Sequence, residues 1–449
     1  MTLSGASGRR AGLPPSPAGF GEPRRSSRGW LASAGGKACT TFLVLLTAAC
    51  RREVSLDDEA RQYVRLAVAL GERDPDALDF YAGPADAVAD VRRDPPTLTA
   101  IKREAEALSA RISQRAPGGA AESGRAKALV ADLAAIGARV DLLTGTRLPY
   151  DKESAVFFGI APASVDPERV ADLRSQIADI IGHGDRLVDR YVAFAARFTI
   201  PPDRLAAVVD AALDECRRRT VAHVTLPPGE RVTIEFVRDK PWSAFSRYAG
   251  DGRSVIQINA DFRFTVDQAL QVACHEGYPG HHTRNTLTAS RRDAPTEPPE
   301  RSVQLMFSPE ALVSEASAML AADLAFSPDE RLRVERDRLF PLAGLQPGGA
   351  ASHIEIERLV GELQDVQADV ARRYLDGDLE FARAVSELEE RALVPHAEAL
   401  VKYINQYRSY VTTYTAGRRA FAATLAACTG ATPSDDVRWR CFLQAFIPK

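Results

Sequence analysis

The chain has 449 residues, enough to bury a sizeable core as one large domain or as two to three smaller ones. Its composition, 45% hydrophobic and 26% charged, is that of an ordinary globular protein. The formal net charge is −3, and the basic residues gather near the start, so the rest of the chain is acidic. We therefore expect no nucleic-acid partner, because phosphate binding needs clustered lysine and arginine.

Residues 1–49 have the features of a secretory signal peptide. Basic residues precede the apolar run 42–46, which is too short to span a bilayer and is followed by small residues and Cys50. The stretch 46–50 (Leu-Thr-Ala-Ala-Cys) resembles a bacterial lipobox, whose cysteine becomes the acylated first residue of the mature protein. We expect an exported protein of the bacterial cell envelope, attached to the membrane only by a lipid on Cys50. A plain signal peptide and a cytosolic product are the alternatives.

After the leader, most of the chain has apolar residues three and four positions apart, which predicts amphipathic helices. Two stretches, 231–237 and 254–259, alternate instead and indicate a small hairpin or a pair of sheet strands. The helices predicted before these strands are Leu56–Leu70, Leu98–Ser113, Ala120–Leu142, Pro167–Ile181, Asp185–Phe198 and Pro202–Thr220.

A further helix is expected from about Val266, with Thr265 as its N-cap, into a histidine-rich motif. The proline-rich segment 288–302 is expected to be a loop, and Ser352–Glu355 fits a capping box. We expect a helical region of residues 50–225, packed as one unit with a metal-binding catalytic region of residues 226–449. The later predicted helices are Pro309–Ala325, Pro328–Leu339, His353–Leu375, Leu379–Leu393 and Pro395–Ala427.

The cysteines favour disulfides over a zinc–thiolate site, since no Cys-x-x-Cys spacing occurs. Cys428 and Cys441 flank a turn segment and suit a disulfide in an oxidising compartment. Cys274 adjoins a histidine and is either a soft metal ligand or, as we favour, a buried small residue or the partner of Cys216.

Residues 275–282 read His-Glu-Gly-Tyr-Pro-Gly-His-His and hold three of the chain's seven histidines. Imidazole is the commonest transition-metal ligand. In an unbroken helix, residues seven apart share a face but lie about 10.5 Å apart, too far for two bonds of about 2.0–2.1 Å to one ion. Pro279 cannot donate a backbone hydrogen bond to the carbonyl of His275, so the helix is expected to bulge or loop here. His281 is then favoured over His282 as the second metal ligand.

Two carboxylates complete the predicted site. Glu276 follows the first histidine, where it can act as a general base toward water activated by a metal. Glu315 is the one acidic residue in an otherwise small and apolar helical stretch, and a buried carboxylate is costly unless it is paired or bound to metal. Glu315 is therefore the candidate third ligand, whereas Glu310 is typical of a first-turn charge at a helix N-terminus.

A stripe of tyrosines follows residue 400, at positions that share one helix face. A phenol can donate a hydrogen bond to the oxyanion of a tetrahedral intermediate, and Tyr414 is the candidate for that role, the others being favoured as core residues. The stripe consists of Tyr403, Tyr407, Tyr410 and Tyr414. Four scattered histidines are expected to be structural or on the surface, with His353 the first to test for substrate contact. They are His183, His223, His353 and His396.

The motif at 275–282 resembles the signature His-Glu-x-x-Pro-Gly-His-His of a bacterial family known as domain of unknown function 885, which is grouped with the gluzincin metallopeptidases. Residues 254–262 look like the asparagine-containing strand of that family, and residues 414–417 like the end of its late Tyr-x-x-Gly segment. Residues 314–318 look like its Glu-Gly-Trp-Ala segment, in which the glutamate is the third ligand. The likeness covers roughly residues 230–420. Here Ala316-Ser317 replaces Gly-Trp, and Arg408-Ser409-Tyr410 replaces Pro-Gly-Gln.

The resemblance implies a mainly α, gluzincin-like helical metallopeptidase fold with a small β-sheet beside the active-site cleft. It favours zinc, although histidine and glutamate accept other divalent ions. The expected function is a zinc-dependent hydrolase that cleaves short peptides in the cell envelope. The alternatives are a metal-dependent amide or ester hydrolase of small molecules and a lipid-anchored binding protein with a degenerate site.

Overall fold

The computed structural model describes residues 55–115, 118–162, 164–291, 297–395, 397–431 and 433–447. The predicted leader with its Cys50, and His396, lie outside the described residues. Residues 54–449 belong to one unit, which contains every element named below. Among the described residues, no helix is both long enough and apolar enough to cross a membrane.

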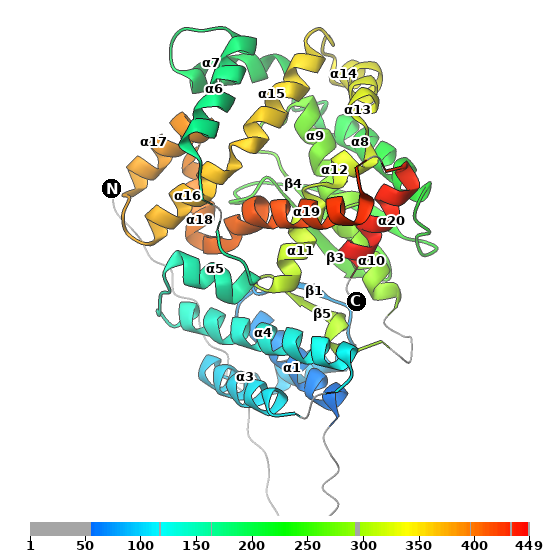
Figure 1. The fold of residues 1–449 in the computed structure, drawn as a ribbon. Coiled ribbons are helices and arrows are strands. Elements are labelled where there is room, and N and C mark those ends of the chain that lie inside the picture. Colours follow the sequence, from blue (N-terminus) through cyan, green and yellow to red (C-terminus); the bar gives the residue numbers. More distant parts are fainter. Residues whose placement is uncertain are drawn as a thin grey trace, which may run out of the picture. The chain divides into compact units, whose positions relative to one another are not determined.

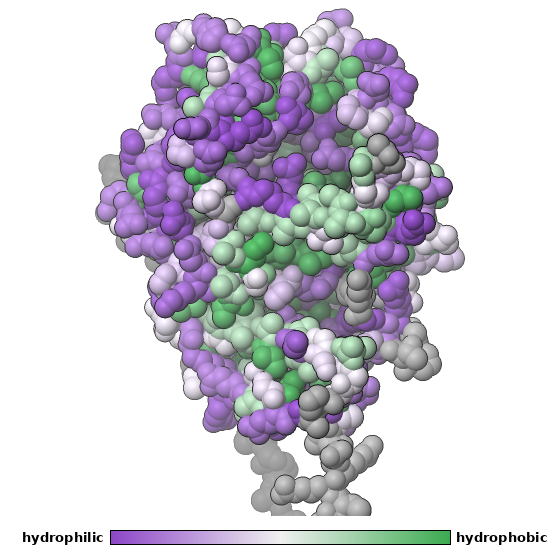
Figure 2. Space-filling view, viewed as in Figure 1, coloured by the Kyte–Doolittle hydropathy of each residue, from purple (hydrophilic) through white to green (hydrophobic). Residues whose placement is uncertain are grey.

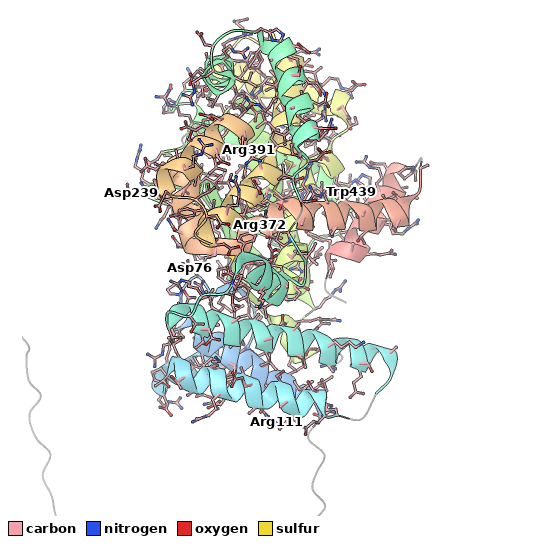
Figure 3. All side chains as sticks on the ribbon, turned by 60° about the vertical axis from the view of Figure 1, so that its left-hand side comes forward. Asp76, Arg111, Asp239, Arg372, Arg391 and Trp439 are labelled. Atoms are coloured by element: carbon pink, nitrogen blue, oxygen red, sulfur yellow. A yellow bond between two sulfur atoms is a disulfide. The ribbon has the colours of Figure 1, made fainter. Side chains whose placement is uncertain are left out.

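Three amphipathic helices form a layer at one end of this unit (Figure 1). Their apolar stripes pack together around Tyr63, Leu108 and Leu133, and two short antiparallel strands close the layer toward the rest of the unit. Turning the molecule brings this layer into side view, with Arg111 on α3 (Figure 3). The elements are α1 (Leu56–Gly71), α3 (Leu98–Ser113), α4 (Ala120–Leu143), β1 (Leu78–Tyr81) and β5 (Val303–Leu305).

The helices between this layer and the sheet follow the predicted pattern, with two additions. α6 begins where Asp166 caps the backbone N–H of Glu168 and Pro167 occupies the first turn. The short helices α2 and α5 were not predicted, because each offers fewer than three turns of periodic sequence. These elements are α2 (Ala85–Arg93), α5 (Tyr150–Phe158), α6 (Pro167–Ile181), α7 (Leu187–Ala195), the 3₁₀ turn η1 (Ala196–Phe198) and α8 (Leu205–Val221).

A three-stranded sheet follows, in the order β2-β4-β3. β2 (Arg231–Val237) and β4 (Arg253–Asn259) are the two predicted strands, and they pair in parallel rather than as a hairpin. β3 (Ala244–Gly250) forms the hairpin with β4 and was missed. Its aromatic residues, Phe245 and Tyr248, lie three positions apart and break the alternation that identifies a strand.

The histidine motif spans a helix break. α9 (Val266–Val272) begins with a capping box of Thr265 and Gln268, which confirms the predicted N-cap, and continues into the π-helical turn η2 (Ala273–Gly277). The chain then leaves the helix, and α10 (His281–Ser290) starts anew. The expected bulge or loop is thus a wide π turn followed by a break in the helix. Gly280 is required there, because a Cβ at this position would stand 1.8 Å from the carbonyl oxygen of His275.

The second half of the chain is almost entirely helical. One of its five predicted helices, Leu379–Leu393, is confirmed as α17 (Phe381–Ala392), and the other four are divided. α15 starts at Ala350 after Gly349, whose φ is 90°, so the expected capping box at Ser352 is wrong and Ser352 lies inside the first turn. The short elements are η3 (Pro299–Ser302), α12 (Ala321–Ala325), α13 (Pro328–Val334), the π turn η4 (Glu335–Leu339), α14 (Phe340–Ala343) and η5 (Arg408–Tyr410). The longer ones are α11 (Pro309–Ala318), α15 (Ala350–Glu362), α16 (Gln364–Leu375), α17 (Phe381–Ala392), α18 (Ala397–Tyr407), α19 (Arg418–Thr429) and α20 (Asp435–Phe446), and the π turn η6 (Thr413–Gly417) lies between η5 and α19.

The fold class is mainly α with small sheets, as predicted. Two disulfides join pairs of helical elements. Cys428–Cys441 joins α19 to α20, and Cys216–Cys274 joins α8 to η2. Both pairings were anticipated, and the second removes Cys274 from the candidate metal ligands. On the face seen in Figure 2, hydrophilic residues cover most helices, and a paler, more hydrophobic band follows the alanine-rich α19 across the middle.

Candidate metal centre

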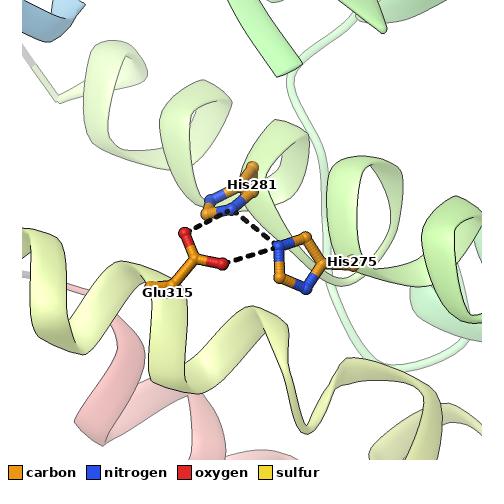
Figure 4. A group of neighbouring side chains, drawn as sticks. All are labelled: His275, His281 and Glu315. Carbon is orange, nitrogen blue, oxygen red and sulfur yellow. Dashed lines mark hydrogen bonds and ion pairs between the residues drawn. The ribbon is translucent and has the colours of Figure 1, made fainter. Parts of the chain in front are cut away.

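Three of the predicted site residues meet at one point (Figure 4). The Nε2 atom of His275 lies 2.9 Å from Oε1 of Glu315 and 3.2 Å from Nε2 of His281. The Nε2 atom of His281 lies 3.5 Å from Oε2 of Glu315. Ligand atoms about 2.0–2.1 Å from a tetrahedral zinc ion are separated by about 3.3 Å, so these distances suit three ligands of one ion.

The local sequence explains how residues six positions apart converge. His275 lies in the π turn η2. The helix breaks at residues 278–280, and His281 is the first residue of the next helix. Glu315 comes from α11, which packs against both η2 and α10. His275 and His281 thus approach each other through a break in the helix at the position of Pro279.

The buried carboxylate of Glu315 is stabilised by the two histidines beside it. Burial opposes ionisation of Glu315, but the neighbouring histidines outweigh it and lower the pKa of this carboxyl. Burial likewise lowers the pKa of His281, but hydrogen bonding to Glu315 outweighs it and raises the pKa to about 9. The carboxylate therefore attracts positive charge, which a divalent cation would supply.

Further hydrogen bonds hold the candidate ligands in orientation. The hydroxyl of Ser314 lies 3.2 Å from Nδ1 of His281, on the ring edge away from Glu315. The hydroxyl of Tyr410 donates to Oε2 of Glu315 at 3.0 Å. Such outer contacts fix the ring orientation and tautomer of metal-binding histidines and the position of ligand carboxylates.

His282, the alternative ligand, faces away from the other three. It is fully buried, with Nδ1 2.8 Å from the hydroxyl of Ser254 and Nε2 2.9 Å from Oε2 of Glu230. Burial alone would raise the pKa of Glu230, but hydrogen bonds from His282, Tyr278 and Arg217 lower it to about 2. His282 therefore anchors the start of α10 to the sheet.

Glu276, the predicted general base, lies beside the group. Its side chain is buried, and its Oε1 atom is 4.0 Å from Nε2 of His275. Burial raises the pKa of this carboxyl, against the opposing effect of the two histidines. It faces the same cavity as His275, His281 and Glu315, in a position to exchange protons with a molecule bound there.

All four tyrosines of the stripe line that cavity. The hydroxyl of Tyr414 is 2.8 Å from the hydroxyl of Tyr403, whereas Tyr410 is the one that bonds Glu315 directly. Burial raises the pKa of each of these three phenols, which keeps them protonated as hydrogen-bond donors. Tyr410 was among the tyrosines favoured as core residues, because no sequence spacing distinguishes the phenol that reaches a carboxylate on another helix.

The cavity has a volume of about 620 Å³ and extends well beyond the candidate ligands. Its wall includes Trp242 and Phe245 beside the sheet, as well as Asp79 from β1. Burial raises the pKa of Asp79, whose carboxylate accepts a hydrogen bond from Gln304 at 2.6 Å. Sequence reasoning missed Asp79, which comes nearly two hundred residues before the motif.

The scattered histidines occupy other parts of the molecule. His353 is fully buried and its ring stacks on Phe198 at 4.3 Å, so it belongs to the core and not to a substrate-contacting surface. His183 is exposed and pairs with Asp179, and His223 stacks on Trp439.

Sequence comparisons with known proteins found no match. No family model matches the chain, and no curated protein matches it in sequence. The resemblance to domain of unknown function 885 therefore remains a prediction.

Solved structures resemble the chain weakly but over most of its length. A candidate lipoprotein from Colwellia psychrerythraea is 14% identical over 87% of this chain and 76% of its own, with a TM-score of 0.46. A candidate lipoprotein of unknown function from Shewanella oneidensis is 12% identical over 88% of this chain and 80% of its own, with a TM-score of 0.38. Metallocarboxypeptidase 1 of Trypanosoma cruzi is 13% identical over 86% of this chain and 89% of its own, with a TM-score of 0.32. At these scores the likenesses carry no argument about function.

Proposed function

We propose that the protein is a metal-dependent hydrolase that cleaves short peptides, with one Zn²⁺ held by His275, His281 and Glu315. The observation that carries the proposal is the convergence of two imidazoles and a carboxylate in the wall of a cavity, beside the buried Glu276. Catalytic zinc sites keep three protein ligands of these kinds and leave room for a substrate.

When bound, the cation would polarise a carbonyl group and lower the pKa of water. The chain's own residues supply the remaining chemistry. Glu276 takes a proton at its carboxylate and returns it to the leaving amine, and Tyr414 donates its hydroxyl hydrogen to the developing oxyanion. The walls of the cavity exclude bulk water, which strengthens both interactions.

The cavity supports peptides as the substrate class. Its volume of about 620 Å³ lies in the range of small-ligand pockets, and its wall mixes aromatic side chains with hydrogen-bonding groups. The leader sequence supports action in the bacterial cell envelope, with a lipid on Cys50 as the membrane anchor.

The test combines metal content with turnover. The purified chain is expected to hold one zinc ion per chain by mass spectrometry of the metal and to hydrolyse short peptides. Glu276→Gln should lower kcat by about 10²- to 10⁴-fold while the metal is retained, since it removes the proton acceptor and leaves the three ligands in place. Glu235→Gln, the same change at an exposed position of β2, is the control and should behave as wild type.

Two results would contradict the proposal: a chain that binds no stoichiometric divalent ion, or peptide turnover that persists in Glu276→Gln. Turnover of esters alone would change the substrate class and keep the metal centre.

A further inference from the structure

The wall of the cavity that holds the metal centre contains three arginines, at positions 331, 358 and 418. Two of them are neutralised by neighbouring carboxylates. Arg331 pairs with Asp267 and Glu335, and Arg358 pairs with Glu355 and Glu362. Arg331 thereby joins α13 to α9, whereas the pairs of Arg358 lie within α15.

Arg418 differs from both. Within the part of the chain that the structure describes, no carboxylate pairs with it, and its Nε–H is buried without an acceptor. The next residue, Arg419, is about half exposed and pairs with Asp365. A buried donor without a partner costs free energy, the more so on a charged group, and an anion in the cavity would remove that cost.

A second polar group on this wall also lacks a partner. The Oε1 atom of Gln364 is buried without a donor, and Gln364 lines the same cavity. The ion pair between Asp365 and Arg419 joins the residues that follow Gln364 and Arg418, so the starts of α16 and α19 are held together. The cavity wall thus contains a charged hydrogen-bond donor, Arg418, and an acceptor, Gln364, that lack partners and lie on adjoining helices.

The last residue of a peptide carries both an acceptor for Arg418 and a donor for Gln364. Its carboxylate accepts hydrogen bonds from a guanidinium, and the N–H of a peptide bond donates to an amide oxygen. Arg418 also follows Tyr414 by only four residues, directly after the π turn η6, and both residues line the cavity. One residue of extended peptide spans about 3.3–3.6 Å, so a carboxylate at Arg418 would place the bond one or two residues before it near Tyr414.

We propose that Arg418, assisted by Gln364, binds the free carboxylate of a peptide's C-terminus, so that hydrolysis removes residues from the carboxyl end. Water adds across the peptide bond, leaving a new carboxylate on the shortened peptide and an amine on the released piece. The inference rests on the proposed function and names the end of the substrate on which that function acts.

The experiment compares one short peptide in two forms, as the free acid and as the C-terminal amide. Binding is measured by calorimetry on zinc-loaded Glu276→Gln, in which turnover is suppressed. The free acid is expected to bind about tenfold to a hundredfold more tightly than the amide, the range for a hydrogen bond to a charged group. Adding Arg418→Gln should remove that preference, and Arg418→Lys should keep part of it. Adding Arg358→Gln, which removes an arginine of the same cavity that is already paired with Glu355 and Glu362, should leave the preference unchanged.

Equal binding of acid and amide, or a preference that survives Arg418→Gln, would overturn the inference, and so would the absence of peptide binding. Turnover separates the two proposals. If the wild type hydrolyses the amide as fast as the acid, the metal centre stands and the carboxylate site fails. If the acid binds preferentially but the wild type never cleaves it, the carboxylate site stands and the hydrolase proposal fails.

Discussion

The helical layer of α1, α3 and α4 and the candidate metal centre both contain buried side chains, but they are held together by different forces. In the layer, apolar stripes exclude water, and each side chain removed would cost burial and packing. At the centre, Glu276, Glu315 and two histidines bring charge into a water-poor space. Burial of charge is favourable only when the charges are matched, so under our proposal a bound cation stabilises the centre and has no such effect on the layer.

The largest expected effect is a difference in zinc affinity between variants of two adjacent histidines, His281 and His282. His281→Ala should weaken zinc binding by more than about a hundredfold, because it removes a ligand, whereas loss of an outer contact costs only about 10- to 100-fold. His282→Ala should retain the ion within that smaller range and lower the melting temperature, since it leaves Glu230 and Ser254 without their shared partner. Competition against a chromophoric chelator measures both affinities. The opposite order would move the ligand from His281 to His282.

A substitution in the core of the helical layer should lower stability and leave metal binding unchanged. Leu133 is 2% exposed within the layer, and Leu133→Ala should lower the free energy of unfolding by about 2–5 kcal/mol, as large-to-small core changes do. Its metal content should not change. Leu143→Ala on the same helix is the matched control, because Leu143 is 39% exposed, and denaturant unfolding compares the two. Equal losses in both variants would show that α4 is not held by its buried stripe.

The smallest expected effect comes from an ionisable group inside the layer. Burial raises the pKa of the Asp132 carboxyl to about 7, although a hydrogen bond with Tyr63 opposes the shift. An unfolded aspartate has a pKa of about 3.9, so between these values the folded chain binds more protons than the unfolded chain. The free energy of unfolding therefore falls as the pH rises from about 4 to 7.

Asp132→Asn should flatten that dependence, and melting temperatures at pH 5 and pH 8 measure it for both chains. An undiminished slope in the variant would assign the pH dependence to other groups.

Regular parts of the molecule were predictable because local spacing determines them. The bounds Leu98–Ser113 and Pro167–Ile181 follow from apolar periodicity and capping residues, and the structure confirms both. The predicted helix of residues 309–325 is instead divided at Met319 and Leu320, where no proline or glycine marks the break. Tertiary packing decides such breaks, and a single sequence does not show it.

The candidate site likewise contains residues that the local sequence predicted and residues that it did not. His275, Glu276 and His281 are close in sequence, and the helix-breaking Pro279 indicates how they converge. Glu315 was found because an isolated acid in an apolar helix needs a partner. Asp79 comes from a remote strand whose local sequence carries no unusual spacing, and the spacing of the tyrosine stripe does not show that Tyr410 is the phenol that bonds Glu315.

The Cys216–Cys274 disulfide has a consequence for ion exchange. It bonds the residue before His275 to α8, so the backbone at this ligand is fixed by a covalent link whether or not an ion is present. A stripped protein should therefore keep an arrangement ready to be refilled. Zinc could then be replaced by cobalt, a spectroscopically visible substitute, without unfolding and refolding the chain.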